Sequence, residues 1–124
     1  MKVMFIEIGM GIDLHGQDIT VASMRAVRNA IQHNSMPGLR SLLPGQDLNN
    51  MRVRVKLGVP ADLDKIDLEQ VKSVFPYGQV TIEAVAGGLL CSSGVVLADK
   101  GDKNDLVYIV NAAVEVGYEE DGTE

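Results

Sequence analysis

The stretch VMFIEIGMGIDLHGQDITVASMRAVRNAI, residues 3–31, predicts how the fold begins: a buried strand, a glycine-rich connection and an amphipathic helix. Residues 3–9 form an apolar run that ends at a glycine, as expected of a strand buried on both faces. After Asp18 the apolar residues recur at helical spacing up to residue 31, and Asp18 is placed to cap the first turn. We therefore expect the strand to break at Gly9 and a helix to follow Asp18.

Residues 51–57 alternate strictly between apolar and basic side chains, which predicts a strand with one basic face. Cations on that face repeat about every 6.6 Å and repel one another unless acids or an anionic ligand balance them. One interpretation is a buried network in which acids from other strands pair with the cations. The cations are Arg52, Arg54 and Lys56, and the acids that interrupt apolar strands are Glu7, Glu83 and Glu115.

The alternative for the basic face is a small-molecule site. In that interpretation Arg52 or Arg54 orients an anionic ligand, and Lys56, which precedes a Gly/Pro turn, points into the site and acts as a base.

The rest of the chain carries one short helical signal and several strand signals. Asp67 and Gln70 have capping-box spacing and a proline ends their segment, which predicts a short helix. The glycine pair 87–88 divides an apolar pattern into two strands or one long bent strand, and residues 106–118 predict a final strand. The breaker-rich residues 33–45 predict a loop or a short helical turn.

This order of elements predicts an α+β fold, a mixed β-sheet with two helices packed on one face. We expect a single domain of the chorismate-mutase-like or ferredoxin-like kind over residues 1–118, and a disordered acidic tail over residues 119–124. Two helices leave the other sheet face partly bare, and the usual remedy is oligomerisation. We therefore expect a ring-forming homo-oligomer, a trimer.

Composition restricts the partners. The 124 residues include 11 basic and 17 acidic side chains, a net charge of −6, which argues against nucleic acid and anionic membranes as partners. A single cysteine fits a reducing compartment, and no apolar run approaches the ~18 residues of a membrane span. We expect a cytoplasmic protein whose partners are a small-molecule ligand and further copies of itself.

The segment GMGIDLHG, residues 9–16, gathers three glycines, an acid and one of the two histidines of the chain. Glycines let the backbone turn sharply and approach a ligand or a neighbouring chain closely. Asp13 and His15 fall on one side of an extended segment, where they can converge on a proton-transfer site or on a divalent metal ion. The residues predicted to bind a ligand are Gly9, Gly11, Asp13, His15 and Gly16.

A metal ion at Asp13 and His15 needs further ligands. The candidates are His33, Cys91, Glu7 or a side chain of a neighbouring subunit. The alternative is that His15 donates a hydrogen bond to Asp13 and locks the loop, with no ligand.

The segment GGLLCSSGVV, residues 87–96, offers the hydroxyls of Ser92 and Ser93 beside a glycine. A hydroxyl nucleophile with backbone N–H groups nearby could serve acyl transfer, although small residues in a bent strand explain the pattern equally well. Cys91 follows two leucines, and we expect a small core residue there.

The N-terminal GMGIDLHG resembles the hallmark of a small family of uncharacterised proteins from bacteria and plants, marked by a G-x-G-x-D-x-H-G motif. The resemblance extends through FPYG to NAAVEVGY, over nearly the whole chain. It implies membership in that family and no activity, because the family has none assigned.

Two shorter resemblances imply chemistry. VRVKLGVP followed by CSSGVVLADKGDKNDLVYIV is similar to the repeated unit of ring-opening amidohydrolases, the cyanuric acid hydrolase and barbiturase family. That resemblance implies a serine–lysine pair, Lys56 with Ser92 or Ser93, in a homotrimer that mimics a three-domain enzyme. GMGIDLH resembles the G-x-D-x-H metal segment of methylerythritol cyclodiphosphate synthase, which implies a divalent metal at Asp13 and His15.

Three functional hypotheses follow. The first is a small-molecule enzyme with sites near subunit interfaces, a hydrolase of cyclic amides in which Ser92 or Ser93 attacks and Lys56 is the base. The second is a metal-dependent enzyme that uses Asp13 and His15. The third is a non-catalytic ligand-binding or assembly module, in which the same residues lock subunit contacts.

Overall fold

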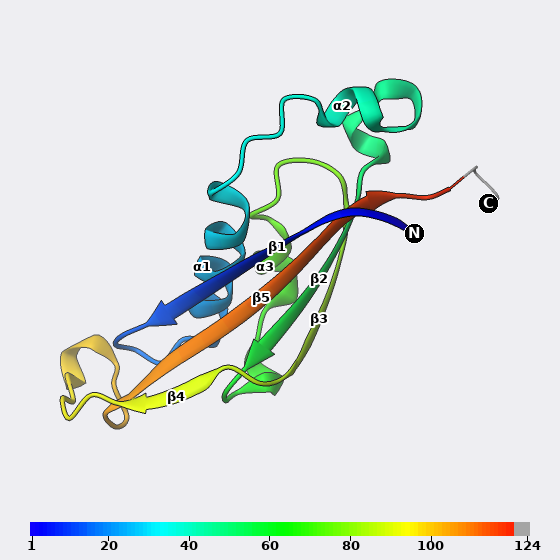
Figure 1. Ribbon diagram of the computed structural model, residues 1–124. Coiled ribbons are helices and arrows are strands. Elements are labelled where there is room, and N and C mark those ends of the chain that lie inside the picture. Colours follow the sequence, from blue (N-terminus) through cyan, green and yellow to red (C-terminus); the bar gives the residue numbers. More distant parts are fainter. Residues whose placement is uncertain (121–124) are drawn as a thin grey trace.

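The computed structural model describes residues 1–120, in which five strands form one mixed sheet (Figure 1). The strand order is β1-β5-β2-β3, and β4 also pairs with β5. Only β2 and β3 are parallel, while β5 runs antiparallel to β1, β2 and β4. The strands are β1 (Lys2–Asp13), β2 (Arg52–Val59), β3 (Gln79–Ala86), β4 (Leu89–Ser92) and β5 (Leu106–Tyr118). The acidic tail was expected over residues 119–124, and its residues 121–124 lie outside the described part of the chain.

Helices α1 and α3 begin at side-chain caps that the sequence predicts, whereas α2 begins at Gly38 without one. Asp18 accepts hydrogen bonds from the N–H groups of Thr20 and Val21 at the start of α1, and Asp67 accepts one from Gln70 at the start of α3. The helices are α1 (Ile19–Gln32), α2 (Leu39–Leu42) and α3 (Leu68–Lys72), with 3₁₀ turns at Pro44–Gln46, Leu48–Asn50, Leu63–Lys65 and Ala98–Lys100. No helix in residues 1–120 is long and apolar enough to cross a membrane.

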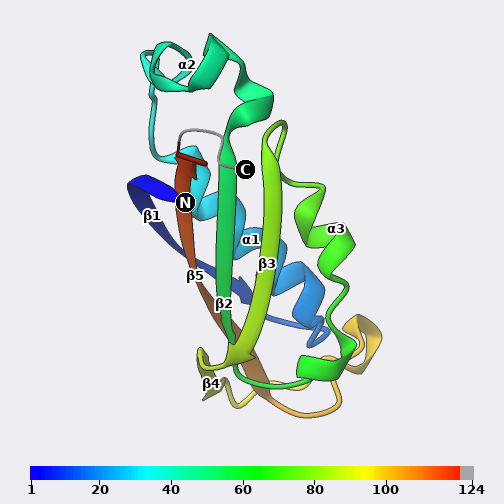
Figure 2. The ribbon, with the colours of Figure 1, turned by 90° about the vertical axis from the view of Figure 1, so that its right-hand side faces the viewer.

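Helix α1 packs against β1 and β5, and α3 packs beside it and against β3, so both cover the same face of the sheet (Figure 2). The core lies between α1 and this face, where Val55, Leu57, Val110 and Val114 are almost fully buried. The expectation of an α+β domain with two helices on one face of a mixed sheet is confirmed. Apart from the four-residue α2, the element order is βαβαβββ, which differs from the βαββαβ order of a ferredoxin-like fold, so that part of the expectation is wrong. The chorismate-mutase-like alternative stays a prediction.

The expected break of the first strand at Gly9 is wrong, because β1 continues through both glycines to Asp13. A Cβ atom on Gly9 would lie 2.3 Å from the carbonyl oxygen of Ala26, and one on Gly11 would lie 2.1 Å from that of Ala22. The glycines therefore let the backbone of α1 rest directly on the backbone of β1, and neither is a hinge.

The opposite face of the sheet, which we term the open face, has no helix over it among residues 1–120. Its side of β1 presents Ile6, Ile8 and Met10, which are 56%, 68% and 55% exposed. In register beside them lie Glu115 and Ala113 on β5. The open face therefore combines an apolar edge strand with a more polar centre.

Candidate functional site

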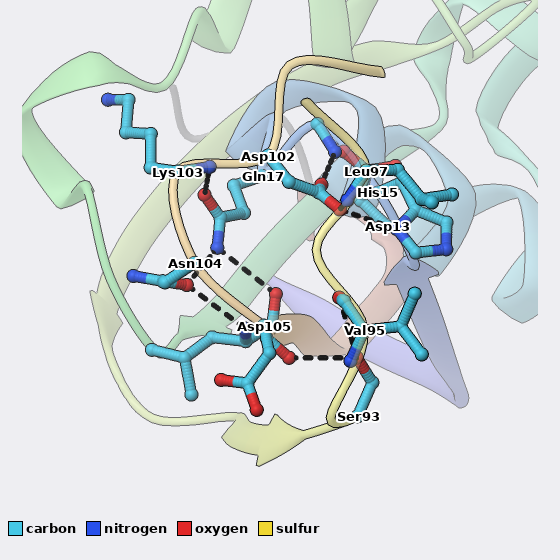
Figure 3. A network of polar contacts seen from close by, with 12 residues as sticks. Asp13, His15, Gln17, Ser93, Val95, Leu97, Asp102, Lys103, Asn104 and Asp105 are labelled. Carbon is cyan, nitrogen blue, oxygen red and sulfur yellow. Dashed lines mark hydrogen bonds and ion pairs between the residues drawn. The ribbon is translucent and has the colours of Figure 1, made fainter. Parts of the chain in front are cut away.

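The connection from β1 to α1 packs against the loop between β4 and β5, and the contacts between the two form the polar network of Figure 3. Asp13 ends β1 on the covered face and is 6% exposed. One carboxylate oxygen accepts the N–H of Asp18 at 2.7 Å, and the other lies 3.5 Å from the Nη1 atom of Arg25. The same Nη1 donates to the Ile12 carbonyl at 2.7 Å. Asp13 thereby fixes the first turn of α1 to the end of β1.

His15 pairs with Asp102, with 2.7 Å between His15 Nδ1 and Asp102 Oδ2. Asp102 also accepts the N–H of Gly16 at 2.6 Å and the N–H of Leu97 at 2.9 Å, and its side chain is only 2% exposed. These backbone N–H groups, Leu97 first and Gly16 second, lower the pKa of Asp102 to about 2, with a smaller contribution from His15. Asp102 is therefore an ionised carboxylate that joins the two loops.

Gln17 also joins the two loops. Its backbone has a left-handed conformation, with φ of 51°. Its Oε1 atom accepts the N–H of Lys103 at 3.1 Å, and its Nε2 atom donates to the Leu106 carbonyl at 3.2 Å and to the side-chain oxygen of Asn104. Because both its donor and its acceptor are hydrogen-bonded, the buried amide of Gln17 has a structural role. Three consecutive residues, 15–17, thus hold one loop.

Gly16 is the position of the motif where a glycine is needed for both conformation and space. Its φ is +101°, and a Cβ atom there would lie 3.1 Å from the Lys100 carbonyl oxygen. A side chain would therefore strain the backbone and push the two loops apart.

The hypothesis that His15 donates to Asp13 is wrong about the partner, which is Asp102. The predicted metal site also does not fit these contacts, because both oxygens of Asp13 face N–H donors and not a cavity for a cation. Within residues 1–120 no three His, Cys, Asp or Glu side chains are grouped to hold a metal ion. The proposed extra ligands lie elsewhere: His33 beside Asn29, Glu7 beside Asn34, and Cys91 on β4.

The hydroxyls of Ser92 and Ser93 close a turn. Ser92 Oγ donates to the carboxylate of Asp105, which also accepts the N–H of Gly94 at 3.1 Å. The Ser92 hydroxyl first, and the Gly94 N–H second, lower the pKa of Asp105. Ser93 Oγ donates to the Asp105 carbonyl at 3.0 Å and accepts the N–H of Val95 at 3.1 Å. Both hydroxyls are thus engaged within residues 92–105.

Cys91 is exposed, so the expectation of a core residue is wrong. Among the described strands β4 pairs with β5 alone and all four of its residues are exposed, so the thiol lies at the surface.

One chain does not bring Lys56 to either serine. Lys56 opposes Ala113 of β5, whereas Ser92 opposes Leu106, seven residues and about 24 Å further along the same strand. Lys56 is exposed on the open face, and its Nζ atom lies 3.9 Å from a carboxylate oxygen of Glu83. The serine–lysine pair inferred from the amidohydrolase resemblance is therefore not assembled within a single chain.

Exposed ion pairs balance Arg54 and Lys56, so the interpretation of the basic face as a buried network is wrong. Arg54 Nε lies 2.5 Å from Glu115 Oε1, a hydrogen bond that raises the pKa of Arg54 and lowers that of Glu115. Glu83 and Glu115 are thus partners of the basic strand, while Glu7 lies on the covered face. Arg52 lies at the start of β2, near Met1 and Glu119.

The sequence analysis missed Asp102, Gln17 and Asn104, although they carry most of the loop contacts. A local signal existed for the loop, since DKGDKND reads as a charged turn and Gly101 has a φ of 88°. Nothing local connects His15 to Asp102, which are 87 residues apart.

The chain belongs to the Lin0512 family of conserved hypothetical proteins, whose family model matches residues 3–116. The expected membership in a small uncharacterised family agrees with this match. Among solved structures, the chain is similar to an FtsZ-like protein of unknown function from Nostoc punctiforme PCC 73102. The two are 39% identical with a TM-score of 0.83, and the match covers 96% of this chain and 97% of the other. No curated protein matches the chain significantly.

Proposed function

We propose that the chain is an assembly module that associates with further copies of itself through the open face of its sheet. The observation that carries this proposal is the strip of exposed apolar side chains on β1, made of Ile6, Ile8 and Met10. Single exposed apolar residues are ordinary, but three on one face of one strand form a continuous apolar surface.

The strip continues along the sheet. Ile12 follows Met10 on the same face of β1 and opposes Ile109 of β5, and both are partly buried. The strip therefore runs along the edge of the sheet toward β4, whose Leu89 opposes Ile109 from the other side and is 62% exposed.

The charges of the open face suit a second copy of the same face. Arg54 pairs with Glu115 and Lys56 with Glu83, so two cations and two carboxylates give these four residues no net charge. The whole chain carries −6, and its other surfaces repel a second copy. Because their charges cancel, these four residues oppose self-association less than the acidic remainder of the chain does.

The size of the open face is also suitable. Four strands at about 4.8 Å spacing and eight residues of β2 at about 3.3 Å each give a face of about 500 Å² in plan. The accessible area of a surface covered by side chains exceeds its plan area, and a standard interface buries about 800 Å² per partner. The open face is of this order.

The G-x-G-x-D-x-H-G segment supports the same proposal through its contacts. Gly9 and Gly11 admit α1, Asp13 holds the start of α1, and His15 and Gly16 bind Asp102. These contacts are architectural, and they maintain the sheet whose open face remains available. The ring and its threefold symmetry remain predictions.

The test is the mass of the purified protein in solution. We expect the wild type to be oligomeric by native mass spectrometry and light scattering, and Ile8→Asp to be monomeric with an unchanged far-UV circular dichroism spectrum. Leu42→Asp is the matched control, because Leu42 is 67% exposed but lies on α2, outside the open face. A monomeric wild type, or an Ile8→Asp variant that keeps the wild-type mass, would overturn the proposal.

A further inference from the structure

A cavity of about 190 Å³ opens on the covered side of the sheet, away from the loops of Figure 3. It lies between the last turn of α1, the segment that leads to α2 and the turn between α3 and β3. Its walls are mostly apolar, and they include Phe5, Ile31, Met36, Leu39, Phe75 and Tyr77. At about 30 Å³ for each water-sized group, the volume holds roughly six such groups. The occupant is therefore a small molecule.

The charged group in the wall of this cavity is the carboxylate of Glu7. Glu7 is 7% exposed, on the covered face of β1, and its Oε2 atom accepts a hydrogen bond from Asn34 Nδ2 at 2.6 Å. The cavity lining contains no lysine, arginine or histidine, and Glu7 forms no ion pair within residues 1–120. The chain thus buries a carboxylate among apolar groups with one neutral donor.

A buried carboxylate is costly unless a cation and several hydrogen bonds compensate it. The single amide of Asn34 supplies one of the four or so hydrogen bonds that a carboxylate can accept. An ammonium group supplies both missing elements, because it carries a positive charge and up to three N–H donors. Glu7 and Asp13 are the two carboxylate residues that are buried in the described chain, and only Asp13 has a cation beside it, that of Arg25. Glu7 is therefore the buried carboxylate that can accept an outside cation.

The apolar walls agree with an organic cation and not a bare metal ion. The aromatic rings of Phe5, Phe75 and Tyr77 can attract a cation through their faces, and Met36 adapts to irregular apolar bodies. A metal ion would need several oxygen or nitrogen ligands, and the lining offers the side chains of Glu7 and Asn34 and the Tyr77 hydroxyl.

From these contacts we propose that the cavity binds a small primary amine, with its ammonium group on Glu7 and its apolar body against the aromatic and methionine side chains. Asn34 is a positioning residue that orients the carboxylate. Tyr77, which is 42% exposed, lies at the solvent side of the site. The cavity and the open face lie on opposite sides of the sheet, so amine binding and self-association are tested independently.

Benzylamine is the probe, because it joins one ammonium group to one small apolar ring. Benzyl alcohol has the same shape without the charge, and benzoate has the opposite charge. We expect benzylamine to shift the amide NMR signals of residues around Phe5, Ile31 and Tyr77 in a saturable way. We expect benzyl alcohol to bind at least tenfold more weakly and benzoate to give no shifts at these residues.

Glu7→Gln keeps the shape of the side chain and removes its charge, and we expect it to weaken benzylamine binding at least tenfold. Glu69→Gln is the matched control, because Glu69 is an exposed carboxylate on α3 outside the cavity lining and the open face, and we expect it to bind like the wild type. If Glu7→Gln does not fold, the comparison of benzylamine with benzyl alcohol on the wild-type protein still tests whether the ammonium group is needed for binding. Equal binding of benzylamine and benzyl alcohol, retention of wild-type affinity in folded Glu7→Gln, or no saturable shifts with benzylamine would each overturn the proposal.

Discussion

The two faces of β1 are built from alternate residues of one strand and meet opposite requirements. On the covered face Gly9 and Gly11 have no side chain, and the backbone of α1 occupies the space that a Cβ atom would need. On the open face Ile8 and Met10 keep large apolar side chains that nothing in residues 1–120 covers. The covered face therefore depends on positions that have no side chain, whereas the open face keeps apolar side chains that no part of residues 1–120 covers.

The comparison shows that alternate residues of one strand can serve different purposes, those of the covered face in folding and those of the open face in association. A side chain added to the covered face meets backbone atoms, which cannot move aside without breaking the helix. A changed side chain on the open face meets solvent in the monomer, so the fold tolerates it and only association responds.

The largest effect is expected for Gly11→Val. Its Cβ atom would lie 2.1 Å from the Ala22 carbonyl oxygen and 2.2 Å from the Ala26 nitrogen, so α1 would have to leave the sheet. We expect a loss of about 3 kcal/mol or more in the free energy of unfolding, or no folded protein, by urea denaturation.

Gly38→Ala is the control for Gly11→Val, because no atom lies within 4 Å of a Cβ atom built there. We expect its free energy of unfolding to stay within about 0.5 kcal/mol of the wild type. A Gly11→Val variant as stable as Gly38→Ala would break the comparison between the two faces.

A smaller effect is expected for Asp102→Asn, which tests the loop at the end of the covered face. Because the folded protein lowers the pKa of Asp102 to about 2 from 3.8, its ionisation stabilises the fold above pH 3.8, and this contribution disappears as the pH falls toward 2. We expect the urea midpoint of Asp102→Asn to lie below that of the wild type at neutral pH, and the difference to narrow between pH 4 and pH 2.

Asp99→Asn is the matched control for the acid titration, because Asp99 is exposed on the same loop. We expect its midpoint to follow that of the wild type at every pH. If the midpoints of wild type and Asp102→Asn fell in parallel with acid, Asp102 would not be the carboxylate that joins the loops.

The smallest effect on folding is expected for Glu115→Gln on the open face. The Arg54 and Glu115 side chains are 53% and 31% exposed, and pairs this accessible contribute little to folding and less in high salt. In a monomeric Ile8→Asp background we expect almost no change in the urea midpoint. In the wild-type background we expect weaker association, because the substitution leaves Arg54 without its partner in the interface. A change in folding larger than the change in association would contradict this distinction.

The patterns that predicted the fold were those with a local cause. Asp18 caps α1 through its own neighbours, the alternation around Arg54 reflects the two faces of β2, and the glycine pair 87–88 separates β3 from β4. The continuation of β1 was missed because glycine stands where a strand pattern expects an apolar side chain. Those glycines are needed because the backbone of α1 packs against them. Helix α1 comes directly after them in the sequence, but this contact is seen only in the folded structure.

The candidate site was less predictable because its contacts join distant segments. Asp13 and His15 lie two residues apart, which suggests a shared ligand or a hydrogen bond between them, but the end of β1 directs Asp13 to α1 while His15 contacts Asp102 across the loops. The resemblance to amidohydrolases predicts that Lys56 and Ser92 lie close together. In the structure they pair with positions of β5 that are seven residues apart. The leucines before Cys91 predict a core position, but all four residues of the strand that carries it are exposed.

The central place of β5 has a consequence for how the chain is made. Lys2 pairs with Tyr118, and β5 is the strand partner of β1, β2 and β4. During synthesis β1 emerges before β5, its strand partner, which lies 95 to 116 residues further along the chain at the paired positions. Until β5 has been made, the nascent chain therefore carries Ile6, Ile8 and Met10 on an unpaired strand, which chaperones can bind and which can aggregate. Pairings so distant in sequence also make for slow folding, so the rate at which the sheet closes is set by its last strand.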